Sequence, residues 1–325
     1  MTKNDVRENI DSITDGLEDF YLITTGGTSG ITASFPSTKL EDDEIYANGY
    51  LGKSWWNINP LDSILMFWGH SHLFGKGRKR YFNKFKRKFN DYMINTIRIS
   101  SYSLSYKNVK SFYDVILSSN PKVIITYSSN IYKICQYMVA NSICYLPKKL
   151  KYIILTSETV TGADISLIKR NFKASVILEY GMAETGQIAY SYGDTENIRV
   201  FWDSFIVTVD DKSKLYLTTI MNKSFPLINY DSEDLVTTKK EYKGSVLNLL
   251  NIKGKTRDVL KVPFNGQSEQ EISAIFFDHA LKSIPNVFSI NYKQEKYGIQ
   301  IFISSDIDLD LDNLITLTFQ CSLGG

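Results

Sequence analysis

A chain of 325 residues is long enough to bury a substantial core, and its length favours two domains over one. Its 43% hydrophobic and 22% charged residues are typical of a globular protein, and no uninterrupted apolar stretch is long enough to cross a bilayer. The net charge of +2 points to no class of partner, and the polar, acidic first twenty residues match neither a secretory signal nor a mitochondrial presequence, which predicts a cytoplasmic protein.

The first informative stretch is LITTGGTSGITAS, residues 22–34, which follows a short apolar run. A run of Gly with Thr and Ser presents backbone N–H groups and hydroxyls to an anion, and polyphosphates are commonly held in this way. The stretch lacks the GK[ST] ending of a Walker loop and does not match GxGxxG. A plain tight turn explains it about as well.

A basic run follows, with eight Lys or Arg residues between Lys76 and Lys88. The favoured interpretation is a solvated basic helix face. The alternative is a patch for a polyphosphate, a nucleotide-bearing carrier, nucleic acid or anionic lipid. Nothing nearby supplies a nucleic-acid motif, so nucleic acid is not expected as a partner.

The middle of the chain alternates between strands and helices. Apolar spacing predicts helices over 109–116, over 131–138 with Ser129 as N-cap, and over 165–172. The predicted strands are 121–127, 151–157 and 175–180, and their nearly continuous apolar character is expected when helices cover both faces of a sheet. Short connections between them predict parallel strands joined by right-handed crossovers, which is an α/β fold.

The last third has a different pattern. Residues 201–221 alternate between apolar and polar side chains, which suits antiparallel strands. NIKGKTRD, residues 251–258, interrupts them, and we predict a domain boundary there that separates residues 1–254 from 255–325. A helix-like segment near 268–282 and a strand at 301–305 follow.

Polar residues stand after the predicted strands, where α/β proteins bind their ligands. Glu184 is a hard oxygen ligand of the kind that Mg²⁺ takes beside phosphates, and Tyr180 offers a flat face for a base. In NYDSEDL, Asp231, Glu233 and Asp234 are carboxylates that can accept hydrogen bonds from ribose hydroxyls. Taken singly, these are also explained as a surface Glu, a packing Tyr and an acidic turn.

The order TGGTSG, TSE, YGMAE, YDSED and GKTRD resembles the adenylate-forming (ANL) superfamily, in particular the phenylacetate–CoA ligase branch with its CapK-like relatives. The resemblance covers most of residues 20 to 305. It implies a large N-terminal adenylation domain with parallel sheets flanked by helices, here N-terminally shortened, and a small, truncated α+β C-terminal lid domain. It also implies activation of a carboxylic acid with ATP through an acyl-adenylate and transfer to a thiol, such as CoA, or to an amine.

The resemblance carries roles to matching positions. Thr28, Glu184 and Lys255 would be catalytic, with Thr28 and Glu184 holding Mg²⁺, and Lys255 with Asp258 forming the hinge of the lid domain. The nucleotide-binding residues would be Thr25, Gly26, Gly27, Thr28, Ser29, Gly30, Glu158, Tyr180, Gly181, Asp234 and Asp258.

The acyl side of the site would be lined by Trp68, His70, His72, Met182 and Gln187. His70 and His72 alternate and could face one way on a strand, but no third metal ligand is evident, so a pocket wall is favoured over a metal pair.

Several positions depart from the family pattern. Lys255 replaces an Arg and so lacks a planar bidentate fork, and Glu233 adds a charge beside Asp234. Both ends are shorter than in relatives, and no C-terminal GK lysine is visible. We therefore expect a fragment of a longer product in preference to a natural short form.

Two other hypotheses stay open at this point. One is a nucleotide-binding remnant or partner subunit without turnover, and the other is acyl transfer to Cys321, as in acyl-protein synthetases. Cys135 is predicted to be a small buried residue on an apolar helix face. The three cysteines show neither a disulfide framework nor a zinc pattern. The leading hypothesis remains an AMP-forming acid–thiol ligase that serves surface-polysaccharide or secondary metabolism.

Overall fold

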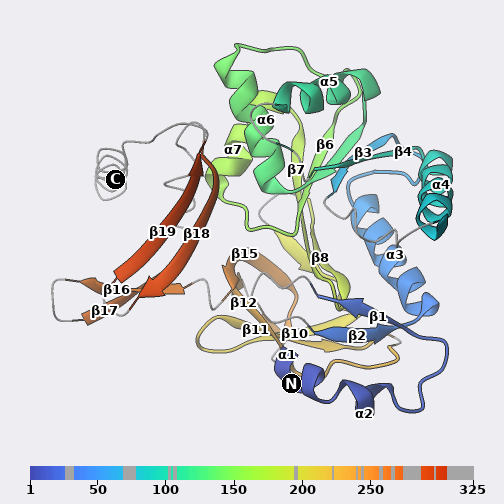
Figure 1. Ribbon diagram of the computed structural model, residues 1–325, viewed down its shortest axis with the longest axis vertical. Coiled ribbons are helices and arrows are strands. Elements are labelled where there is room, and N and C mark those ends of the chain that lie inside the picture. Colours follow the sequence, from blue (N-terminus) through green and yellow to red (C-terminus); the bar gives the residue numbers. More distant parts are fainter. Residues whose placement is uncertain are drawn as a thin grey trace. The chain divides into compact units, whose positions relative to one another are not determined.

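The computed structural model describes residues 1–25, 33–68, 78–101, 104, 108–193, 197–221, 223–238, 241–242, 245–255, 259–264, 268–273, 287–295 and 298–305 (Figure 1). The chain divides into two compact units. The first comprises residues 1–232 and 236–252, and the second comprises residues 233–235 together with the chain from Lys253 onward.

Eleven strands of the described chain form the main sheet. In spatial order they are β10 (Phe205–Val209), β11 (Lys214–Thr219), β12 (Tyr230–Thr238), β15 (Asn248–Lys255), β9 (Ile198–Val200), β8 (Gly186–Ser191), β7 (Ser175–Met182), β6 (Tyr152–Thr156), β5 (Val123–Thr126), β3 (Ile64–Trp68) and β4 (Thr96–Ser100). The neighbouring pairs from β4 to β7 are all parallel, which confirms the predicted α/β core. From β7 onward the pairs β7–β8, β8–β9, β9–β15 and β10–β11 are antiparallel. The β10–β11 pair confirms the antiparallel strands that the alternation in 201–221 predicts.

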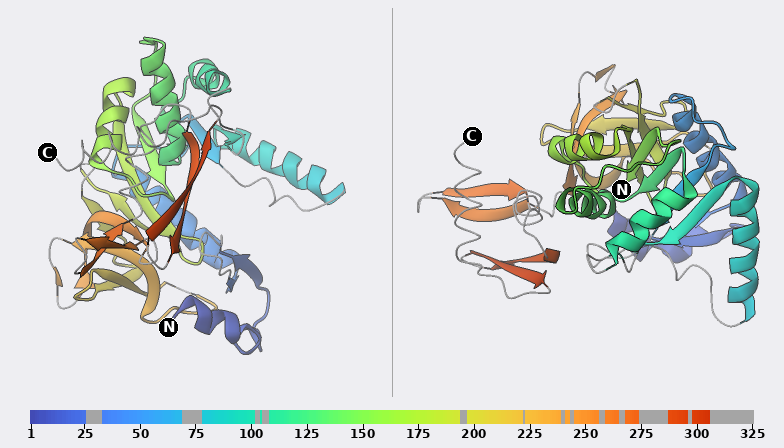
Figure 2. Two further views of the ribbon diagram at one scale, coloured as in Figure 1. Left: turned by 60° about the vertical axis from the view of Figure 1, so that its left-hand side comes forward. Right: turned by 90° about the horizontal axis from the view of Figure 1, so that it is seen from above.

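Helices cover both faces of the parallel strands (Figures 1 and 2). The helices of the described chain are α1 (Lys3–Glu8), α2 (Ile10–Thr14), α3 (Lys39–Ser54), α4 (Arg78–Met93), α5 (Val109–Ser119), α6 (Ser128–Ala140) and α7 (Gly162–Phe172). Apolar side chains of α5, α6 and α7 pack with one face of β3, β5, β6 and β7 in a single buried cluster. The other face of the sheet packs against the end of α3 and the residues that follow it, including Trp55 and Ile58.

Strand β5 shows why these strands are apolar throughout. Ile124 belongs to the cluster under α5–α7, whereas its neighbours Val123 and Ile125 belong to the cluster on the opposite face. Successive strand residues point to opposite faces, so a strand covered on both sides needs an apolar residue at every position. Cys135 of α6 is fully buried, as predicted for a small residue on an apolar helix face.

Two predictions about local structure are wrong. Ser129 is not the N-cap of the second helix, which begins at Ser128 after Tyr127. Residues 268–273, expected to begin a helix, form strand β17 (Ser268–Ser273), which pairs antiparallel with β16 (Val259–Phe264) in register along its whole length. The Glu- and Gln-rich sequence favours helix locally, and pairing with the β-branched strand beside it overrides that preference.

Besides β16–β17, three further pairs of described strands form separate two-stranded sheets. They are β1 (Tyr21–Thr24) with β2 (Ser34–Ser37), β13 (Glu241–Tyr242) with β14 (Ser245–Val246), and β18 (Val287–Glu295) with β19 (Gly298–Ser305). Strand β19 contains the strand predicted at 301–305. No helix in the described ranges combines the length and the apolar character that a membrane span requires.

Candidate functional site

The glycine-rich stretch lies within a hairpin that is separate from the main sheet. β1 and β2 pair antiparallel, and the backbone N–H of Thr25 donates to the carbonyl of Ala33 at 2.9 Å. The backbone N–H of Ala33 in turn donates to Thr25 Oγ1 at 3.2 Å. The apolar residues on both sides of the glycines pair with each other, so the short apolar run before them is not a strand of the main sheet. Gly26, Gly27, Thr28, Ser29 and Gly30 lie outside the described residues.

The base of this hairpin packs against the motif that contains the predicted ribose carboxylates. Ala33 and Phe35 of the hairpin are buried in one cluster with Leu227 and Tyr230. The rings of Phe35 and Tyr230 meet edge to face, with 6.0 Å between their centroids. Residues about 200 positions apart in the sequence are thereby held together by apolar burial and an aromatic contact.

Glu184 lies in the turn between β7 and β8 and is only 7% exposed. The Tyr230 hydroxyl donates a hydrogen bond of 2.7 Å to Glu184 Oε1. Burial with a specific hydrogen bond contradicts the alternative of a surface Glu. The hairpin base, Tyr230 and the turn that carries Glu184 therefore meet at one place in the first unit.

This turn needs its glycines. A Cβ atom on Gly181 would lie 2.4 Å from the carbonyl oxygen of Gly186. Gly186 itself has φ +70°, and a Cβ there would lie 2.5 Å from the side chain of Ile45 in α3. Only glycine permits both the close approach and the left-handed backbone. The turn is thus built to bring Glu184 inward.

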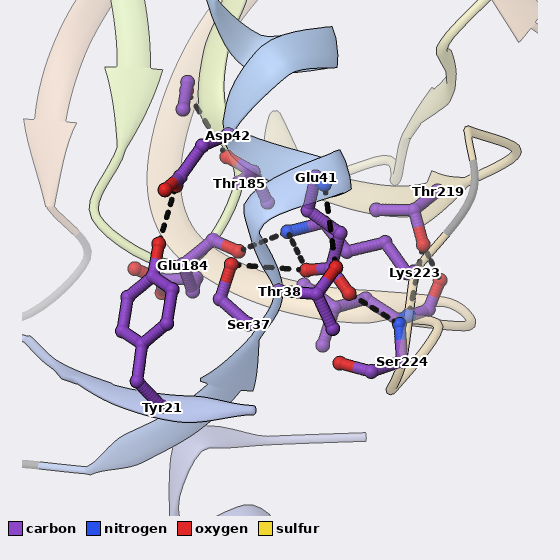
Figure 3. A network of polar contacts seen from close by, with 12 residues as sticks. Tyr21, Ser37, Thr38, Glu41, Asp42, Glu184, Thr185, Thr219, Lys223 and Ser224 are labelled. Atoms are coloured by element: carbon purple, nitrogen blue, oxygen red, sulfur yellow. Dashed lines mark hydrogen bonds and ion pairs between the residues drawn. The ribbon is translucent and has the colours of Figure 1, made fainter. Parts of the chain in front are cut away.

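Lys223, which forms a buried ion pair with Glu41, also binds the backbone carbonyl of Glu184 (Figure 3). Lys223 Nζ donates to the Glu184 carbonyl at 3.0 Å and lies 3.6 Å from Glu41 Oε2. The side chains of Lys223 and Glu41 are 3% and 2% exposed. Burial lowers the pKa of Lys223 below its usual range, although the charge of Glu41 acts to raise it.

Glu41 also connects the hairpin to the chain after β11. Its carboxylate accepts hydrogen bonds from the Ser37 hydroxyl at 3.1 Å and from the backbone N–H of Ser224. Its own N–H donates to Thr38 Oγ1, which caps α3. In this way β2, the start of α3 and the segment of Lys223 form one polar network, which Figure 3 shows.

A second contact ties strand β1 to the same helix. The Tyr21 hydroxyl donates to Asp42 Oδ1. Burial, followed by this hydrogen bond, raises the pKa of Tyr21 to about 12. Both strands of the hairpin are thus fixed to the first turn of α3, whose two acids also suit the positive end of the helix dipole.

Sequence reasoning missed Glu41, Lys223 and Tyr230. The pattern Thr38-x-x-Glu41 is a capping-box signature, so Glu41 is explained locally as a helix start. A lysine inside the apolar stretch IMNKSFPLI was the available signal for a buried partner, because Lys is almost never fully buried unless paired.

Glu158 has a structural task in the described chain. Its carboxylate accepts hydrogen bonds from the backbone N–H of Ser129 at 2.7 Å and from the hydroxyls of Ser128 and Ser129 at 2.9 and 2.8 Å. It therefore supplies the N-terminal cap of α6 that we had expected Ser129 to provide. A role beside the nucleotide stays a prediction.

The ring of Tyr180 is buried in the core, at 7% exposure, and stacking on adenine also stays a prediction. Asp234, on β12, is likewise 7% exposed, and Lys255 is the last residue of β15. Asp258, His70, His72 and Cys321 lie outside the described residues.

Three of the predicted pocket residues are described. Trp68 ends β3 and stacks on Tyr127, with 5.4 Å between the ring centroids. Met182 packs against two of the buried clusters. The side-chain amide oxygen of Gln187 is buried and has no hydrogen-bond partner within the described chain. A buried acceptor of this kind is unfavourable until something donates to it.

Of the two predicted metal ligands, Glu184 is described and Thr28 lies outside the described residues. No group of three or more His, Cys, Asp or Glu side chains that could hold a metal ion occurs among the described residues. Glu184 supplies one carboxylate, which is the hard oxygen donor that Mg²⁺ prefers beside substrate phosphates. This donor fits a magnesium ion that is held mainly by its nucleotide.

No protein-family model matches the chain. "Protein CapK" from Staphylococcus aureus is 22% identical over 343 aligned residues, which cover 97% of this chain and 70% of the relative.

Solved structures match the fold more clearly. A 2-hydroxyisobutyryl-CoA ligase in complex with R3-HIB-AMP gives a TM-score of 0.67 at 14% identity, over 98% of this chain and 72% of the ligase. ATP-bound MatB from Rhodopseudomonas palustris gives 0.55 at 12% identity, over 92% and 60%. The amide bond synthetase McbA from Marinactinospora thermotolerans gives 0.55 at 11% identity, over 90% and 61%. The chain has the mixed α/β fold of the adenylate-forming enzymes.

Proposed function

We propose, from this adenylate-forming fold, that the chain activates a carboxylic acid with ATP through an acyl-adenylate. One observation carries the proposal: Ala33 and Phe35, in the hairpin that flanks the glycine stretch, pack against Tyr230, whose hydroxyl binds the buried Glu184. A phosphate-binding loop and an acid for the metal are needed together in such chemistry, and the sequence separates them by about 150 residues. Positioning and electrostatics dominate catalysis of this kind.

The residues divide the work as follows in this proposal. Magnesium-bound ATP supplies an α-phosphate that the substrate carboxylate attacks, with pyrophosphate as the leaving group. Thr25 to Gly30 hold the phosphates, Thr28 and Glu184 hold the metal, and Asp234 holds the ribose. Tyr230 orients the Glu184 carboxylate, and Lys223 fixes the backbone of the same residue through its carbonyl.

The acyl pocket is proposed on the side of Trp68 and Gln187. The stacked Trp68 and Tyr127 rings give a flat apolar wall, and the buried Gln187 amide oxygen needs a donor, which a hydroxyl or amino group on the acid or its adenylate can provide. Met182, His70 and His72 complete the proposed pocket.

The acceptor is proposed to be a thiol of the CoA type, with an amine as the alternative. One structural neighbour is a CoA ligase and another is an amide bond synthetase, so both acceptors occur on this fold. Lys255 and Asp258 are proposed as the hinge of residues 255–325. The proposed role lies in surface-polysaccharide or secondary metabolism, in the cytoplasm.

ATP–pyrophosphate exchange with a panel of aryl, fatty and amino acids tests the proposal. Exchange with at least one acid is expected, and Glu184→Gln should abolish it, whereas Glu8→Gln, on an exposed acid, should not change it. Folding is checked by circular dichroism. ATP binding by calorimetry without exchange for any acid would identify a nucleotide-binding remnant instead. A covalent acyl mass that Cys321→Ser abolishes would identify transfer to that cysteine.

A further inference from the structure

Helix α4 is strongly amphipathic. At about 100° per residue, the sequence places its aromatic residues and Met93 within one sector of about 120°. These residues are Tyr81, Phe82, Phe85, Phe89, Tyr92 and Met93. Six of the seven Lys and Arg residues of the helix lie outside this sector, and the seventh, Arg78, is the first residue of the helix. A surface helix of this kind normally turns its apolar side to the core.

Helix α4 does the opposite. Its polar side faces the sheet, because Asp91 accepts hydrogen bonds from Arg98 of β4, at 3.0 Å from Nη2 and 3.2 Å from Nε. Asp91 is only 13% exposed in this bidentate ion pair. On the other side, Phe89 is 56%, Tyr92 78% and Met93 59% exposed. Phe89, Tyr92 and Met93, the residues of this sector whose side chains the structure describes, therefore face outward.

The outward-facing apolar surface continues past the last residue of the helix, because Ile94 follows Met93 in the chain and is 39% exposed. Strand β4 is the edge strand of the main sheet. Its residue Ile97 does not belong to this surface, because it pairs with Leu65 on the sheet face under α5–α7, whereas its neighbour Arg98 points to the face that contacts α4. Figures 1 and 2 show α4 on the outside of the sheet next to β4. We call Phe89, Tyr92, Met93 and Ile94 the α4 surface.

The charges at its borders indicate what covers the α4 surface. Lys86 and Lys88 are exposed and fall on the two opposite edges of the aromatic sector. The whole helix has seven Lys or Arg residues and a single Asp. A second copy of this chain would bring like charges together, which is unfavourable. Aromatic residues between two rows of basic residues are the pattern of a helix that lies flat in an anionic lipid surface.

We propose that the α4 surface docks the protein on anionic membranes, with the aromatic residues at the level of the lipid headgroups and Lys86 and Lys88 on lipid phosphates. This goes beyond the proposed adenylation and does not depend on it. The mode is peripheral, because α4 lies on the membrane and does not span it.

Vesicle co-sedimentation of the full chain tests the proposal. Binding is expected to vesicles that contain phosphatidylglycerol and not to pure phosphatidylcholine, and added salt should weaken it. The double variant Lys86→Gln, Lys88→Gln should reduce the partition coefficient about 25-fold, because each lysine neutralised near an anionic surface weakens binding about fivefold. Tyr92→Ser should also reduce it severalfold.

The chain offers matched controls in the loop between α6 and β6. Tyr145 is 78% exposed, like Tyr92, and Lys148 and Lys149 are both exposed. Tyr145→Ser and the Lys148→Gln, Lys149→Gln pair should leave membrane binding unchanged. All of these variants alter exposed side chains, so they should keep the urea midpoint of the parent, and pyrophosphate exchange without vesicles should not change.

Three results would overturn the proposal. The first is equal binding to both kinds of vesicle, or to neither. The second is an effect of the lysine variants without any effect of Tyr92→Ser, which would describe a simple polyanion patch. The third is concentration-dependent dimerisation in sedimentation velocity that Tyr92→Ser abolishes, which would make the α4 surface a contact between copies.

Discussion

Replacing Lys223 by Met should be among the most destabilising single changes in the first unit. The variant keeps the apolar stem and removes the ammonium, so Glu41 stays buried without its counter-charge. At 3.6 Å, two unit charges attract by about 5 kcal/mol with an effective dielectric constant of about 20. Lys223 no longer has to be desolvated, which offsets part of this loss, and breaking a buried pair from one side typically costs about 3–5 kcal/mol. We expect a value in that range.

Urea unfolding followed by circular dichroism measures this loss as a fall in the midpoint at constant slope. The companion variants are Glu41→Gln and the double variant. The double variant removes both charges, so it should be clearly more stable than the sum of the single losses predicts, with a coupling energy of about 1–3 kcal/mol. Lys110→Met breaks an exposed pair with Asp114 and should leave the midpoint unchanged.

A loss of less than about 1 kcal/mol in Lys223→Met would refute the reasoning, because the charge of Glu41 would then be compensated by Ser37 and Ser224 alone. Additive losses in the double variant would refute the coupling of the two side chains. Pyrophosphate exchange is a second readout. Residual folded Lys223→Met protein should exchange more slowly, because the Glu184 carbonyl has lost its donor.

The other predictions concern single groups. Tyr230→Phe removes the hydrogen bond to the Glu184 carboxylate and should slow pyrophosphate exchange about tenfold or more, since bonds to charged groups contribute about 1.5–3 kcal/mol; an unchanged rate would remove Tyr230 from the site. Burial raises the pKa of Glu179 above its ordinary value of 4.5, so its contribution to stability is present below that pH and is lost as the pH rises through the folded-state pKa. Glu179→Gln should therefore stabilise the protein at pH 8, and the gain should vanish in urea titrations towards pH 4. Burial raises the pKa of Cys135 to about 12, so at pH 8 a thiol reagent should label the exposed Cys144 and reach Cys135 only after unfolding, as read by peptide mass mapping.

The parallel core could be predicted because each strand is explained by its own residues. Val123, Ile124 and Ile125 are apolar in sequence and are buried on two different faces, so a local pattern carries the information. Local patterns failed where a distant partner decides. Ser129 was expected to cap α6, and the cap comes from Glu158, about 30 residues further along the chain.

The candidate site was predictable by residue type and not by arrangement. Glu184 was identified because an acid after a strand is a common metal ligand. Its side chain is buried, so it is not an ordinary surface acid. Its support comes from Tyr230 and Lys223, which lie 46 and 39 positions away, and Glu41 is 183 positions from Ser224. No periodicity in the sequence encodes contacts at such separations, because they depend on how the hairpin and the sheet pack.

The two hydrogen bonds that fix Glu184 have a consequence for ligand affinity. Tyr230 fixes its carboxylate and Lys223 fixes its carbonyl, so both ends of the residue are already ordered in the free protein. The ordering cost of this turn falls on the folding reaction, and a metal–nucleotide complex that arrives later meets a rigid acid. Binding of the complex at Glu184 should therefore cost little conformational entropy, because the residue does not have to be ordered by the ligand.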